Sequence, residues 1–190
     1  MIEGILSIII FGMLLAIGVI AAYAILIFNS LIRLRNNIEK SWSNIDVLLK
    51  QRNDEIPNLM KTVEGYMEHE KETFKRVTDA RTSIQRSQTV HDKAVSDDLL
   101  THALKTLFAV AENYPQLKAN ENFLALQKRI TSLEDLIADR REFYNDTVTT
   151  YNIRIQQVPD TLIARSLSYD KKDLFKARSD ERPPVDTVFG

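Results

Sequence analysis

The feature that most constrains this chain is a run of 24 residues without a charged side chain, residues 5–28. At a rise of about 1.5 Å per residue, a helix of this length crosses the ~30 Å hydrocarbon layer of a bilayer. We therefore predict a membrane-spanning helix that starts near Ile5, passes Leu15 and ends near Phe28. The lipid bilayer is the first partner that the sequence predicts.

A cleaved signal peptide is the competing interpretation of this run. Residues 22–24 form the A-x-A pattern that signal peptidases cut. However, a signal peptide has a basic start and a short apolar core. Here the only charged residue before the run is the acidic Glu3, and the apolar run continues beyond Ala24 to Phe28. We therefore favour a permanent anchor.

The charges beside the run predict its orientation. Arg33, Arg35 and Lys40 follow it closely, and no Lys or Arg precedes it. Because loops rich in Lys and Arg stay on the cytoplasmic side, the bulk of the chain should lie in the cytoplasm, with the N-terminus outside. We therefore expect a single-pass membrane protein.

Composition limits what the rest of the chain does. About 160 residues follow the run, enough for one modest domain. Of the 26 acidic residues only Glu3 precedes them, so 25 acidic and 25 basic residues balance, and no net field attracts nucleic acid. The chain has no cysteine, and Gly65 is the only glycine between the anchor and Gly190. Thiol chemistry and glycine-rich phosphate loops are therefore excluded.

The spacing of apolar residues predicts four helices and no strand. They cover residues 31–67, 69–86, 99–111 and 120–158, with a loop at residues 87–96. Pro57 should kink the first helix, although Asn53 or Asp54 offers a cap for a separate one. Asn120 is a suitable N-cap for the fourth.

The predicted fold is all-α: an N-terminal transmembrane helix followed by a long antiparallel up-and-down bundle of four helices, two long and two short. We divide the chain into an anchor at residues 1–30, a bundle at residues 31–159 and a C-terminal tail at residues 160–190.

Three regions are candidates for contacts with partners. Two short helices cover only part of two long ones, which predicts a stalk near the membrane with an exposed apolar stripe that self-associates or binds another membrane protein. A simple coiled-coil pair is the alternative explanation. The stripe comprises Leu34, Ile38, Trp42, Ile45, Val148, Tyr151 and Ile155.

The second candidate is the loop before the fourth helix, at the end of the bundle far from the membrane. It either binds a partner or only caps two helix ends. Its candidate residues are Glu112, Asn113, Tyr114, Pro115 and Asn120. The third candidate is the tail, whose apolar and basic residues either lie on the bilayer surface or pack against the stalk.

No residue set predicts catalysis, a metal or a cofactor. His69, His91 and His102 lack the spacing of metal ligands. Arg52 and Arg140 lie on apolar seams, where a buried cation with a carboxylate partner most often fixes helix register. Tyr-Asn pairs at residues 144–145 and 151–152 place two tyrosines on one helical stripe, which we interpret as core aromatics.

Three strings occur together and in order: LRNNIEKSWSNIDVLLKQRNDEIPNLMKTVEGYMEHE, ENYPQLKANENFLALQ and RREFYNDTVTTYNIRIQQVP. With them the chain resembles the LemA family over residues 1–178. The resemblance implies a bacterial inner-membrane protein with its N-terminus outside, a cytoplasmic bundle of antiparallel helices and no enzymatic activity.

A non-enzymatic scaffold or adaptor is the function that this resemblance favours. Such a protein forms a homo-oligomer or docks on another membrane protein. The alternative is a regulator or accessory factor of a membrane metalloprotease in envelope quality control, because members of the family are often encoded beside such a protease.

Overall fold

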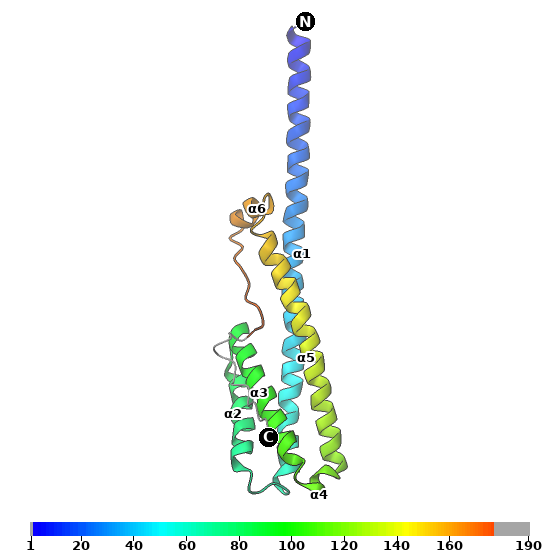
Figure 1. Ribbon diagram of the computed structural model, residues 1–190. Helices are drawn as coiled ribbons and strands as arrows, with labels where there is room; N and C mark the ends of the chain where they lie inside the picture. Colours follow the sequence, from blue (N-terminus) through cyan, green and yellow to red (C-terminus); the bar gives the residue numbers. More distant parts are fainter. Residues whose placement is uncertain (1, 177–190) are drawn as a thin grey trace, which may run out of the picture. The chain divides into compact units, whose positions relative to one another are not determined.

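One helix, α1 (Ile2–Glu64), forms the first third of the chain in the computed structural model, which describes residues 2–176 (Figure 1). Pro57 lies inside α1, and the helix continues through it. The buried residues Ile56 and Leu59 lie on either side of Pro57, so the apolar stripe keeps its phase there. The predicted continuity is confirmed, and a separate helix capped by Asn53 or Asp54 is wrong.

The described residues form two compact units. The first unit holds residues 2–40 and 147–172, and the second holds residues 41–146 and 173–176. The predicted boundaries after residues 30 and 159 both fall within the first unit. They divide the chain by expected role, whereas the two units divide it by packing.

The first unit contains the apolar part of α1. Large side chains on this part are exposed, among them Phe11 at 69% and Ile20 at 68%. Within residues 2–176, α1 is the one helix that is long and apolar enough to cross a membrane. Apolar side chains exposed along a whole helix are stable in lipid and not in water. This part of α1 therefore has the length and composition of a membrane anchor.

The second unit has one hydrophobic core, to which α1 and four further helices contribute. These are α2 (Lys71–Arg86), α3 (Val90–Ala111), the short α4 (Pro115–Lys118) and α5 (Glu121–Arg154). Burying each large aliphatic side chain contributes roughly 1.5–3 kcal/mol. The core includes Leu59, Val63, Met67, Val77, Leu100, Leu104, Leu107, Leu117, Phe123 and Ile130.

The predicted loop at residues 87–96 is wrong, because α3 already begins at Val90. Thr89 caps the helix, its Oγ1 accepting a hydrogen bond from the backbone N–H of Asp92 at 3.0 Å. Ser96 is buried, and its hydroxyl lies 2.7 Å from that of Ser83 and 2.8 Å from that of Ser87. Because the first turns of α3 are held by hydrogen bonds of polar side chains, of which Ser96 is buried, an apolar pattern did not reveal them.

The remaining helix ends differ by a few residues from those predicted. α2 begins at Lys71 and not at residue 69, and α5 ends at Arg154 and not at residue 158. A short helix, α6 (Asp160–Ser166), lies in the region predicted as tail. The Asn120 cap is confirmed, since its Oδ1 accepts the N–H of Phe123 at 3.0 Å. Residues 2–176 contain helices and no strand, which confirms the all-α class.

Candidate functional site

The Tyr-Asn pair at residues 144–145 of α5 binds the backbone of an extended segment. This segment, residues 169–176, is called the strap. Asn145 binds both backbone groups of Phe175: its Nδ2 donates to the Phe175 carbonyl at 3.3 Å, and its Oδ1 accepts the Phe175 N–H at 2.8 Å. The hydroxyl of Tyr144 donates to the carbonyl of Asp173 at 3.0 Å.

The side chain of Phe175 is fully buried beside these hydrogen bonds. Its ring centroid lies 5.7 Å from that of Trp42, and the Arg141 guanidinium lies 5.2 Å above it. Nε of Arg141 also donates to the Phe175 carbonyl at 2.9 Å. We call the four residues that hold Phe175 the Phe175 site: Trp42, Arg141, Tyr144 and Asn145.

Neighbouring side chains hold the Phe175 site in place. The Trp42 ring lies 5.7 Å from the Tyr144 ring at an interplanar angle of 57°, and Nζ of Lys93 lies 5.4 Å from the Trp42 ring. Nη1 of Arg141 donates to Oδ1 of Asp98 at 2.8 Å. Burial raises the pKa of Tyr144 to about 12, because a phenolate loses its hydration there.

The first unit repeats this arrangement with the pair at residues 151–152. Asn152 binds both backbone groups of Lys172, each at 2.9 Å, and the Tyr151 hydroxyl donates to the carbonyl of Asp170 at 3.2 Å. Tyr169 lies 6.4 Å from the Tyr151 ring. The Arg35 guanidinium lies 5.3 Å from the Tyr169 ring. We call Arg35, Tyr151 and Asn152 the Tyr169 site.

The two pairs have matching spacings along the helix and the strap. They are seven residues apart on α5, and the strap residues that they bind are three residues apart. Seven helical residues rise about 10.5 Å, and three extended residues span roughly 10 Å. The Tyr-Asn repeat therefore matches the repeat of an extended chain, which the interpretation as core aromatics missed.

Comparison with known proteins identifies the family of this chain. The model of the LemA family matches residues 41–189. The chain belongs to the LemA family. A LemA protein of Metamycoplasma hominis is 29% identical over 164 residues, which cover 84% of this chain and 73% of that relative.

Two magnetosome proteins named MamQ are further relatives of this LemA-family chain. One, from Paramagnetospirillum magneticum, is 24% identical over 90% of this chain and 72% of its own length. The other, from Magnetospirillum gryphiswaldense, is 22% identical over 92% of this chain and 74% of its own length. The range of the LemA match contains the whole Phe175 site and the strap.

The exposed stripe predicted for the stalk of this LemA-family chain is wrong. Most of its residues are buried within the chain itself, and Leu34 and Trp42 are half-buried. Trp42 contacts Phe175, and Tyr151 binds Asp170. The strap therefore packs against stripe residues that the sequence pattern left without a neighbour. The buried residues of the stripe are Ile38, Ile45, Val148, Tyr151 and Ile155.

Arg52 is the centre of a buried charged cluster in the second unit. Only 1% of this residue is exposed, and its guanidinium pairs with Asp97 of α3 and Glu134 of α5. Nη1 also donates to Oγ1 of Thr101 at 2.9 Å. Burial raises the pKa of the Asp97 and Glu134 carboxyl groups, although Arg52 opposes the shift. A cation paired across three helices fits the predicted role in register.

The prediction for Arg140 is wrong by one position. Arg140 is exposed, whereas Arg141 lies on the buried face and binds Phe175. The buried stripe of α5 passes from Ile137 to Tyr144, so Arg141, four residues after Ile137, occupies the seam. The alternating steps of three and four along the sequence did not decide which arginine faces inward.

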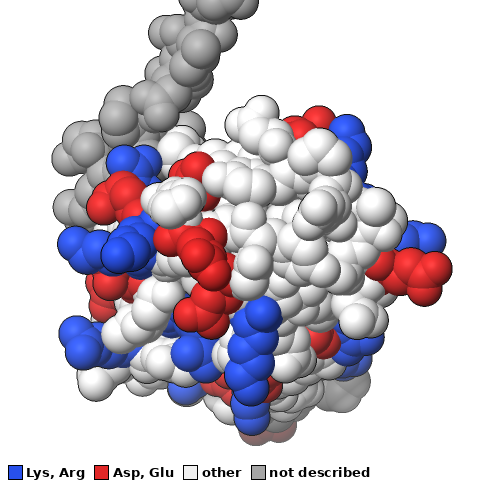
Figure 2. Space-filling view, turned by 90° about the horizontal axis from the view of Figure 1, so that it is seen from below, with Lys and Arg blue, Asp and Glu red and all other residues white. Residues whose placement is uncertain are grey.

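The predicted loop before α5 contains α4, with Pro115 at its first position. The hydroxyl of Tyr114 donates to Oε1 of Glu70 at 3.0 Å, and Nδ2 of Asn120 donates to the Tyr66 hydroxyl at 3.2 Å. Asn113 is exposed. These bonds are compatible with the structural alternative, and binding of a partner by this loop stays a prediction. Figure 2, which looks at the molecule from below, shows a broad uncharged area beside groups of acidic and basic side chains.

The same loop also carries an exposed ion pair. Nζ of Lys118 lies 3.4 Å from Oε2 of Glu112. Within residues 2–176, no three His, Asp or Glu residues are placed to hold a metal ion.

Proposed function

We propose that this LemA-family protein is a non-enzymatic scaffold, anchored by α1 in the bacterial inner membrane, that self-associates or docks on other membrane proteins. The observation that supports the anchor is the exposed apolar surface of α1 over residues 5–28. About 24 helical residues span the hydrocarbon core.

In this proposal the chain crosses the membrane once, with its N-terminus outside. Arg33, Arg35 and Lys40 follow the apolar run and belong to the cytoplasmic side by the positive-inside rule. The rest of α1, with α2, α3 and α5, then forms an up-and-down antiparallel bundle in the cytoplasm. The shared hydrophobic core of these helices supports this arrangement.

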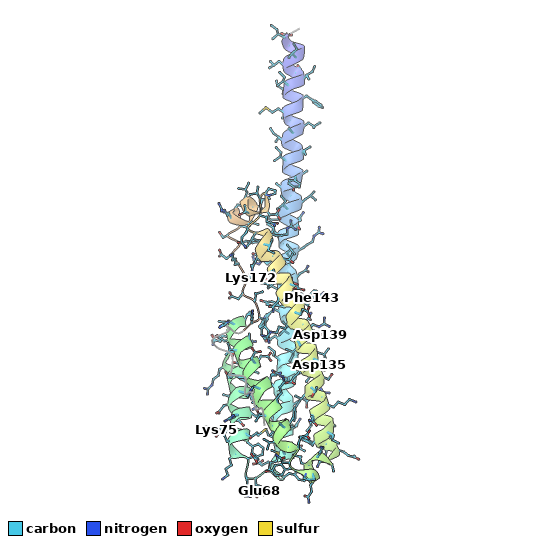
Figure 3. All side chains as sticks on the ribbon, in the orientation of Figure 1. Glu68, Lys75, Asp135, Asp139, Phe143 and Lys172 are labelled. Atoms are coloured by element: carbon cyan, nitrogen blue, oxygen red, sulfur yellow. The ribbon has the colours of Figure 1, made fainter. Side chains whose placement is uncertain are left out.

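The exposed faces of the helices are where the proposed scaffold meets its partners. Phe143 on α5 is 57% exposed, and Asp135 and Asp139 precede it at intervals of four residues (Figure 3). Residues four apart share one helix face, so an aromatic group and two carboxylates are displayed together. Such a face suits a partner helix with apolar and basic residues.

The test is crosslinking in intact membranes, followed by affinity purification of the full-length protein and mass spectrometry. We expect recovery of the protein itself or of another integral membrane protein, with an intact N-terminus. The variant Phe143→Ala should reduce recovery, and Leu99→Ala, at a residue 39% exposed on α3, is the matched control. A soluble product that lacks its first 24 residues would overturn the proposal, because the A-x-A pattern ends there.

A further inference from the structure

The strap has the character of a bound peptide. Of its residues 170–176, only Phe175 is buried, and the other side chains are exposed. The second unit contacts Asp173 and Phe175 through backbone groups: Asn145 binds the N–H and carbonyl of Phe175, Arg141 binds the same carbonyl, and Tyr144 binds the carbonyl of Asp173. The site therefore recognises an extended backbone and one aromatic side chain.

The Phe175 site also has contacts that do not involve the strap. Trp42 packs against Tyr144 and Lys93, and Arg141 is bound to Asp98. These three contacts lie within residues 41–146 and need no strap residue. A site that keeps its shape when empty loses little conformational freedom when it binds a ligand.

We propose that the Phe175 site is a peptide-binding site that exchanges its own strap for the strap of a second copy of this chain. The ligand is an extended segment with an aromatic residue. Two residues before that residue, the segment offers a backbone carbonyl that can accept a hydrogen bond from Tyr144. The strap itself is the segment that fits this description in the structure, and every second copy carries it. Exchange of identical segments replaces each contact by an identical one.

This inference rests on the proposed membrane anchor. Copies anchored in one bilayer share a plane and an orientation, which raises the effective concentration of one strap at the site of another. Ser168, directly before the strap, has a φ of 53°, in the left-handed region that few residues other than glycine adopt. Rotation of the backbone at Ser168 would move the strap away from α5. The helices would stay intact, because α6 ends before this residue, at Ser166.

Trp42 is the only tryptophan of the chain, so its fluorescence reports on the site. The first test uses the full-length variant Phe175→Ala in nanodiscs and a synthetic peptide of residues 169–176, YDKKDLFK. We expect a saturable change in Trp42 fluorescence. A matched peptide with Ala in place of the phenylalanine should give at least a tenfold weaker response. Equal responses to the two peptides would overturn the proposed site.

The second test identifies the occupant in membranes. A photo-crosslinking phenylalanine analogue replaces Phe175 in one tagged full-length copy, which is co-expressed with a differently tagged wild-type copy. We expect a crosslinked product that carries both tags and is lost in Asn145→Ala. The analogue at Leu174, an exposed neighbour, is the control and should give little of this product.

Crosslinks confined to single chains, or formed only with a different protein, would overturn exchange between copies. Membrane flotation of the same sample separates the two proposals. Protein that floats with lipid but shows no two-tag product contradicts the exchange alone. Protein that does not float contradicts the proposed anchor.

Discussion

The Arg52 cluster and the Phe175 site belong to the same unit, yet they hold polar groups in opposite ways. Arg52 is 1% exposed and is bound by side chains of two other helices, Asp97 and Thr101 of α3 and Glu134 of α5. The Phe175 site binds a segment whose flanking side chains are exposed. Opening the cluster requires the helices to separate, whereas opening the Phe175 site requires only the strap to leave. The same unit therefore contains a cluster fixed by its helices and a site whose bound strap we propose to be exchangeable.

The largest effect should come from Arg52→Ala. Removing this arginine leaves Asp97 buried without its cation, so the free energy of unfolding should fall by about 3–5 kcal/mol. This change is measured by unfolding the full-length protein with urea in detergent and monitoring the loss of helix by circular dichroism. The control is Arg129→Ala, which removes a pair to Glu55 from an arginine that is 62% exposed. It should cost at most about 1 kcal/mol. Equal losses in the two variants would contradict a special role of burial.

An intermediate effect should come from Asn145→Ala and Asn152→Ala. Each variant removes two hydrogen bonds to one strap residue, Phe175 or Lys172 respectively. Water replaces part of these bonds on the exposed strap, so each variant should lose about 1 kcal/mol. Amide hydrogen exchange should accelerate at Phe175 in the first variant and at Lys172 in the second. The same acceleration at both residues in both variants would show that the strap is released as one cooperative segment.

The last effect should appear only in alkali. Because the folded protein raises the pKa of Tyr144 to about 12, the neutral phenol stabilises the fold fully at lower pH. This contribution is present below about pH 10, the ordinary tyrosine pKa, and is lost as pH rises through the higher folded value. Ultraviolet absorbance of tyrosinate measures the titration, and Tyr144→Phe should remove its last step. An unchanged titration in that variant would assign the step to another tyrosine.

Periodicity in the sequence was sufficient for elements with apolar faces. The apolar N-terminal part of α1, the continuity of α1 through Pro57 and the Asn120 cap all follow from apolar composition, apolar spacing or a known cap residue. The start of α3 did not, because Ser96 and Asp97 are buried by hydrogen bonds and an ion pair. Apolar spacing cannot detect a helix turn that buries polar side chains through specific partners.

The Phe175 site could be predicted only in part. The repeat of the Tyr-Asn pairs was visible, and Tyr144 and Tyr151 are buried as core aromatics would be. The role of Asn145 depends on Phe175, which lies 30 residues further along the chain. The strap is an extended segment without periodicity, so nothing in its sequence marks the register in which it meets α5.

The matched spacing of the two Tyr-Asn pairs limits how the length of this chain can change. Deleting one strap residue between Lys172 and Phe175 shortens the extended path by about 3.4 Å, and one asparagine then loses its backbone partner. Inserting one residue into α5 between Asn145 and Asn152 turns one asparagine by about 100° around the helix. Seven residues added to α5 and three added to the strap keep both asparagines opposite their backbone partners. Keeping both sites whole also requires seven added residues in α1 between Arg35 and Trp42. We therefore expect relatives whose helices differ in length here to differ by seven helix residues for every three strap residues.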